Sequence, residues 1–183
     1  MAANWGTFEQ QLTKYFNDKN AENLQAAAST IAQYYHSAVG SAMIITIPGA
    51  TGLGLAPSPI ENGFKSSFQT ALDGKGNKIT PSTFTAAANG VIQYWTGKSF
   101  VPSAVPPGMV ITTSNTVTFP GVPAPLASQL NQAFQHSEAD QTVRIMKSAF
   151  QGHLQTIAGV WNGLMPSPTG PVTAPPFPWT GIA

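Results

Sequence analysis

Two segments of the chain read almost alike: Ala26-Ala27-Ala28-Ser29-Thr30-Ile31-Ala32-Gln33-Tyr34-Tyr35 and, at a shift of 60 residues, Ala86-Ala87-Ala88-Asn89-Gly90-Val91-Ile92-Gln93-Tyr94-Trp95. Each segment places apolar side chains three or four positions apart, which is the spacing of one buried face of an α-helix. Phe8 and Leu12, which precede the first segment, fall on Phe68 and Leu72 at the same shift. These matches suggest a repeat of helical units.

A third copy of the unit is fainter. Leu12 and Phe16 align with Leu130 and Phe134 at a second, longer shift. Ala-rich helices also resemble one another by chance, so coincidence explains the matches as well as a true repeat does. With either explanation, each unit is predicted to contain a short helix, a polar turn, a longer helix and an apolar arm rich in Pro and Gly.

The periodic segments set the expected helix limits. Helices are predicted at about 8–16 and 21–42 in the first unit, at 64–72 and from 80–82 onward in the second, and at 126–134 and 138–161 in the third. Asn20 is the expected N-cap of the second helix, because its side chain can accept a hydrogen bond from a free backbone N–H. The predicted fold class is mainly α, with helical hairpin units, Pro/Gly-rich extended arms and a small β-hairpin.

The arms between and after the helices differ in composition. Residues 109–119 are rich in β-branched side chains around Ser114 and Asn115, which predicts a short β-hairpin, and residues 43–47 are expected to add a strand. Residues 164–183 contain six Pro and no helical pattern. A Pro-rich segment loses little conformational entropy when it binds. We therefore expect a helical core over 1–163, with the hairpin near 109–119, and an extended Pro-rich C-terminal arm over 164–183.

Charged residues are scarce and unevenly spread. Asp, Glu, Lys and Arg make up 8 % of the 183 residues, against about a quarter in ordinary soluble domains. None occurs in 24–60, 99–137 or 148–183. Much of the surface is therefore expected to be apolar or neutral, as on proteins that bind other proteins. The net charge of +1 gives no basic field for a polyanion, so no direct nucleic-acid partner is expected.

Other composition features restrict the setting. No stretch approaches the roughly 20 apolar residues of a membrane span, and the first residues lack the pattern of a secretory signal. No membrane partner is therefore expected. The absence of Cys excludes disulfides and thiolate metal sites, which suits a protein made in the cytoplasm.

No motif points to catalysis or to a metal. A G-x-S-x-G elbow is absent, and His36, His136 and His153 lie apart without a second ligand type at metal spacing. Glu138 and Asp140 suit the first turn of a helix, where negative charge is stabilised. The sequence therefore predicts no enzyme, no catalytic residue, no metal site and no cofactor.

Few charges, no Cys, helical units with apolar arms and a C-terminal segment rich in Pro and Trp together resemble the small virion structural proteins of tailed bacteriophages. The resemblance is one of composition and organisation over the whole chain. It implies a non-enzymatic structural or adaptor subunit of a multi-protein particle, which would be the tail, neck, baseplate or capsid of a phage virion. It also implies that the partners are other copies of the chain and other virion proteins, in a virion assembled in the host cytoplasm.

The C-terminal arm holds the expected partner-binding residues, in which apolar side chains alternate with prolines: Phe177, Trp179, Ile182, Pro176 and Pro178. Removing residues 164–183 is expected to leave the helical core folded and to abolish association. The alternative function is a stand-alone helical binding module, which would hold an apolar ligand or peptide between helices rich in Phe and Tyr. In that case the arms would fold onto their own core.

Overall fold

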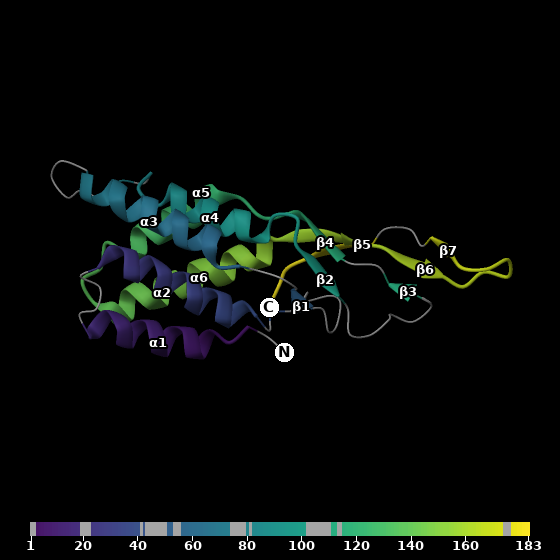
Figure 1. The fold of residues 1–183 in the computed structure, drawn as a ribbon, viewed down its shortest axis with the longest axis horizontal. Helices are drawn as coiled ribbons and strands as arrows, with labels where there is room; N and C mark the ends of the chain where they lie inside the picture. Colours follow the sequence, from purple (N-terminus) through teal and green to yellow (C-terminus); the bar gives the residue numbers. More distant parts are fainter. Residues whose placement is uncertain are drawn as a thin grey trace.

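The computed structural model describes residues 3–18, 23–40, 42, 51–52, 56–73, 80, 82–101, 111–112, 115–173 and 177–183. The helices form a body at one end of the long axis, and the short strands lie toward the other end (Figure 1). The helices are α1 (Trp5–Asn17), α2 (Leu24–Val39), α3 (Ser58–Asp73), α4 (Thr85–Trp95), α5 (Pro123–Ala133) and α6 (Ala139–Thr156). The strands are β1 (Thr51–Gly52), β2 (Ser99–Val101), β3 (Ile111–Thr112), β4 (Asn115–Phe119), β5 (Ala158–Trp161), β6 (Gly163–Met165), β7 (Val172–Thr173) and β8 (Phe177–Thr180). The predicted mainly α class is confirmed.

The six helices of the described chain form a closed ring of helical hairpins. Consecutive helices pack against each other, and α1 closes the ring by packing against α6. Each hairpin therefore pairs the two helices of one predicted unit. The N-cap of α2 is Asn23 and not the predicted Asn20, which lies outside the described residues. The Asn23 side chain accepts hydrogen bonds from the backbone N–H groups of Gln25 and Ala26.

Backbone contact holds the α3–α4 hairpin together. At Gly63 an added Cβ would lie 2.5 Å from the Ala86 carbonyl oxygen, and at Gly90 it would lie 2.4 Å from the Pro59 carbonyl oxygen. Real Cβ atoms essentially never come this close to another atom. Glycine at both positions therefore allows α3 and α4 to approach so closely that any larger residue would clash with the backbone of the other helix.

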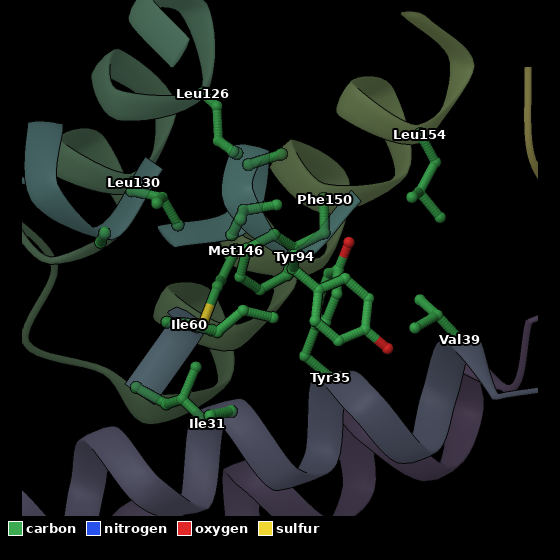
Figure 2. Close-up of a cluster of buried hydrophobic side chains, with 14 of the residues drawn as sticks. Ile31, Tyr35, Val39, Ile60, Tyr94, Leu126, Leu130, Met146, Phe150 and Leu154 are labelled. Carbon is green, nitrogen blue, oxygen red and sulfur yellow. The ribbon is translucent and has the colours of Figure 1, made fainter. Parts of the chain in front are cut away.

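Aromatic and aliphatic side chains fill the centre of the ring. Figure 2 shows Tyr35 of α2, Tyr94 of α4 and Phe150 of α6 in this core. The Tyr35 ring centre lies 4.7 Å from that of Phe150 and 5.5 Å from that of Tyr94. The Trp95 Nε1–H donates a hydrogen bond of 2.8 Å to the Tyr35 hydroxyl, which gives two buried polar groups a partner.

Residues that align at the shift of 60 are buried in both copies: Ala28 with Ala88, Ile31 with Val91, and Tyr35 with Trp95. The last pair is the one joined by the hydrogen bond, so the first two units meet at aligned positions. The likeness is weaker outside the helices. Residues 56–59 and 165–168 share the sequence Pro-Ser-Pro, but the first segment enters α3 and the second enters the turn after β6.

The strands form two antiparallel sheets beyond one end of the helix ring (Figure 1). The larger sheet has the order β1-β2-β4-β5-β8, and the smaller one has the order β3-β6-β7. The first described strand after each helical hairpin joins the larger sheet: β1 after α2, β2 after α4 and β5 after α6. β8 pairs with β5 and is an edge strand, a position that tolerates Pro178.

Two predictions of secondary structure are wrong, one about a hairpin and one about the end of a helix. The described parts of 109–119, β3 and β4, do not pair as a hairpin, because β3 pairs with β6 in the smaller sheet while β4 pairs with β2 and β5 in the larger one. β-branched composition favours a strand without choosing its partner. The helix predicted over 138–161 ends at Thr156, and residues 158–161 form β5.

The predicted boundary between residues 163 and 164 does not separate two parts of the fold. β6 (Gly163–Met165) runs across it, and β8 belongs to the larger sheet. Residues 164–173 and 177–183 are extended or turn segments without helix, but their strands join sheets whose other strands precede residue 164. The physical reason is that Trp179 and Ile182 are buried in the core, where removing apolar surface from water stabilises the fold by roughly 25 cal/mol per Å². Residues 43–47, the other predicted strand, lie outside the described residues.

Candidate functional site

The partner-binding residues predicted in the C-terminal segment do not lie together on the surface. Trp179 and Ile182 are each 2 % exposed and belong to the main hydrophobic core. Pro178 is exposed on β8, and Phe177 pairs through its backbone in the same strand. Pro176 lies outside the described residues. Two of the three expected apolar anchors, Trp179 and Ile182, are therefore buried, whereas Pro178 is exposed.

Trp179 is held by the larger sheet. Its ring covers Gly159 of β5, where an added Cβ would come within 2.3 Å of the ring, and it meets Phe100 of β2 edge-on at 5.8 Å between ring centres. The Ile182 backbone N–H donates a hydrogen bond of 3.0 Å to the Leu154 carbonyl at the end of α6. The prediction that Trp179 and Ile182 anchor a partner is corrected by this burial, because in this fold they contact their own core.

A different part of the C-terminal segment reaches away from the body. We call residues 163–173, which comprise β6, its turn and β7, the β projection, and Figure 1 shows it at the end of the molecule farthest from the helices. Met165 is 38 % exposed and Val172 is 47 % exposed. The Gly170 N–H donates a hydrogen bond of 3.0 Å to the Ser167 carbonyl. Gly170 has a φ of 114°, which glycine adopts without strain, so the turn has a defined shape.

Among the described residues, little stabilises the β projection within one copy of the chain. The described strands of its sheet, β3, β6 and β7, are two or three residues long. No residue of 163–173 belongs to the main hydrophobic core. Small sheets need a helix or a second apolar face to pack against. The exposed Met165 and Val172 side chains are therefore candidates for contact with another molecule.

The other end of the molecule holds an apolar groove. Helices α1, α3 and α5 end here, and helices α2, α4 and α6 begin here (Figure 1). The groove has a volume of about 480 Å³ and is lined mainly by four phenylalanines and two leucines: Phe16, Phe68, Phe84, Phe134, Leu24 and Leu72. Its described lining residues carry no charge. We call it the aromatic groove.

Ring contacts join the phenylalanines of the aromatic groove into one surface. Phe84 and Phe134 stack with ring centres 4.6 Å apart, and Phe68 meets both rings edge-on at 6.2 and 5.5 Å. Phe16 meets Phe134 edge-on at 6.5 Å. Phe84 is 1 % exposed, whereas Leu72 is 60 % exposed. The rings therefore form the floor of the groove and Leu72 part of its rim.

The three histidines do not converge on a site. His36 Nδ1 lies 2.9 Å from the Tyr94 hydroxyl, and His153 Nε2–H donates a hydrogen bond of 2.9 Å to the Pro120 carbonyl. Burial lowers the pKa of His153 to about 4, although the Pro120 bond opposes this shift, so the ring is neutral at pH 7. His136 lies in the α5–α6 connection. Within the described ranges, no three potential metal ligands gather in one place.

The described helices include none that is both long and apolar enough to cross a membrane. No protein-family model matches the chain, and comparisons with curated proteins and with solved structures found no significant match. The function is therefore inferred from the β projection and the aromatic groove.

Sequence patterns indicated burial for several residues of the aromatic groove without identifying the groove, and they did not single out Met165 or Val172 of the β projection. The helical spacing of Phe16, Phe68 and Phe134 indicates burial, but it does not reveal that three helix ends bring these rings together. The turn signal of the β projection is stronger, because Pro168-Thr169-Gly170-Pro171 combines the two residue types that punctuate a chain. That signal predicts a turn. The exposure of this turn at the far end of the molecule depends on the fold.

Proposed function

We propose that the chain is a non-enzymatic structural or adaptor subunit of a multi-protein particle, and that this particle is a phage virion. The observation that carries the proposal is the β projection, a sheet of very short strands with exposed apolar side chains and no charge. Such a sheet gains stability when another protein covers it. The proposed partners are other copies of the chain and other virion proteins.

The shape of the molecule supports the same proposal. The described residues extend along one axis, with the helices toward one end and the β projection at the other (Figure 1). An elongated subunit of this kind can reach several neighbours. Charged residues make up 8 % of the chain. Packing such copies closely therefore requires little removal of water from charged groups.

Mass spectrometry of purified particles tests the proposal. Cells infected by a phage that lacks its own copy of the gene would supply the chain from a plasmid, as wild type, as Pro168→Glu or as Val122→Glu. Pro168 is exposed in the turn of the β projection, and Val122 is a matched exposed position on the helical body. We expect wild type and Val122→Glu in the particles at a fixed copy ratio, with Pro168→Glu depleted. Wild-type chain that stays in the unassembled fraction contradicts the proposal.

The aromatic groove favours a second candidate function, a helical binding module for an apolar ligand or peptide. Its volume of about 480 Å³ falls in the range of roughly 300–1,000 Å³ that is typical of small-molecule sites. Titration of the full chain with the apolar fluorescent dye Nile red tests this function. We expect saturable binding that Leu72→Glu weakens and Val122→Glu leaves unchanged. Fluorescence that rises without saturation, or equally in all three proteins, contradicts it.

A further inference from the structure

The turn of the β projection presents prolines in a fixed conformation. Pro166, Pro168 and Pro171 are all exposed, and each ring restricts its own φ angle. The hydrogen bond from Gly170 to Ser167 closes the turn between them. Because the backbone is already ordered, binding this turn costs less conformational entropy than binding a flexible loop.

The aromatic groove has the surface that such a turn requires. Pro-rich segments bind grooves lined by aromatic rings, since the pyrrolidine ring packs flat on an aromatic face. The half-buried Phe134 and Phe16 rings, which lie over the buried Phe84 and Phe68, offer this surface. Ser137, an exposed residue of the groove lining, has a hydroxyl that can donate to a carbonyl of the turn.

The two surfaces also match in charge. The described lining of the aromatic groove has no charged side chain, and residues 148–183 contain no Asp, Glu, Lys or Arg. A charged segment would lose water on entering the groove without finding an opposite charge among those lining residues. An uncharged, proline-bearing turn does not meet this penalty.

The helix ends that carry the residues of the aromatic groove lie at one end of the long axis, and the β projection lies at the other (Figure 1). We infer that the aromatic groove of one copy binds the turn of the β projection of a second copy, so that copies join head to tail. Such a contact uses two different surfaces, and each added copy leaves one groove and one turn free. It therefore builds an open chain, or a ring if the rotation between copies closes. This inference rests on the assembly role proposed above and names a partner for both surfaces.

Two charge-insertion variants and their mixture test the inference. Leu72→Glu places a charge at the groove, Pro168→Glu places one in the turn, and Val122→Glu places one at a comparably exposed site that belongs to neither. Size-exclusion chromatography with light scattering gives the mass of each full-length protein over a range of concentrations. Circular dichroism verifies that each variant is folded, and Leu72→Gln replaces Leu72→Glu if the latter is not.

We expect the average mass of wild type and of Val122→Glu to rise with protein concentration. Leu72→Glu alone and Pro168→Glu alone should each self-associate at least about tenfold more weakly than wild type. The equimolar mixture of Leu72→Glu and Pro168→Glu should form dimers and stop there. In that dimer the intact turn of the first variant meets the intact groove of the second, and both remaining ends are blocked. A mixture that stays monomeric, variants that associate like wild type, or a wild type that is monomeric throughout would each overturn the inference. If the chain is nevertheless present in purified particles, the assembly role stands and only its self-association fails.

Discussion

Replacing Trp179 with alanine should destabilise the fold, although a Pro-rich tail suggests an anchor for partners. The side chain is 2 % exposed and its ring covers Gly159 of β5. It also meets the Phe100 ring edge-on, with ring centres 5.8 Å apart. Removing the side chain leaves a cavity over Gly159 and beside Phe100 of the larger sheet.

The size of the effect follows from this packing. Truncation of a buried Trp to Ala costs about 3–5 kcal/mol. The lower end applies here, because the Trp179 Nε1–H has no hydrogen-bond partner in the described part of the chain and its removal relieves an unsatisfied group. A loss of about 3 kcal/mol should lower the melting temperature by roughly 6–12 °C for a chain of this length.

Urea unfolding of the full-length chain, followed by circular dichroism, measures the loss. Trp179→Phe is the matched control, since it keeps an aromatic ring and drops the unpaired N–H, and it should cost about 1–2 kcal/mol. An alanine variant with the wild-type unfolding midpoint but reduced association would refute the reasoning. Trp179 would then contact a neighbouring molecule and not its own core.

Further substitutions test the α3–α4 contact, a buried hydrogen bond and His153, with the exposed Gly152 as a control position. Gly90→Ala should lower the free energy of unfolding by about 1–3 kcal/mol, because its Cβ would lie 2.4 Å from an α3 carbonyl oxygen. Gly152→Ala, whose Cβ meets no atom within 4 Å, should raise it by about 0.5–1 kcal/mol; urea titrations in which both variants shift alike would contradict the close α3–α4 contact. Tyr35→Phe leaves the buried Trp95 Nε1–H without its acceptor and should cost about 1–3 kcal/mol in the same titration, and a wild-type midpoint would show that this bond adds nothing. The free energy of unfolding should decrease as the pH is lowered from about 6.5 to about 4. In this range the unfolded chain binds a proton at His153, whereas the folded chain, in which the pKa of His153 is about 4, keeps the ring neutral. The change should reach up to about 3 kcal/mol, and His153→Gln, followed by thermal unfolding across this range, should flatten the slope; a variant slope equal to that of wild type would show that other groups cause it.

Helices could be predicted from the sequence because their signal is local. Leu126 and Leu130 repeat at helical spacing, and α5 lies where this pattern predicts it. The same signal failed at the end of α6. Ile157 and Val160 continue the helical spacing past Thr156, but the chain turns into β5 because pairing with β4 and β8 outweighs local preference.

The strand partners and the two candidate surfaces depend on distant residues. Ile111 and Val117 both lie in strands, yet one belongs to each sheet. Trp179 has the composition of an anchor whether a partner or its own core covers it. Phe84 contributes to the aromatic groove because it stacks on Phe134 from another hairpin. No pattern within one segment contains this information.

Hydrogen–deuterium exchange of the C-terminal segment tests most directly the division between a buried strand and an exposed projection. Amide exchange would be followed by mass spectrometry in the dilute chain and in the assembled chain. Amides of 177–182 should exchange slowly in both states, because β8 is part of the larger sheet. Amides of 163–173 should exchange rapidly in the dilute chain and slowly after assembly. The opposite result, in which residues 177–182 become protected on assembly while 163–173 do not change, would contradict the account.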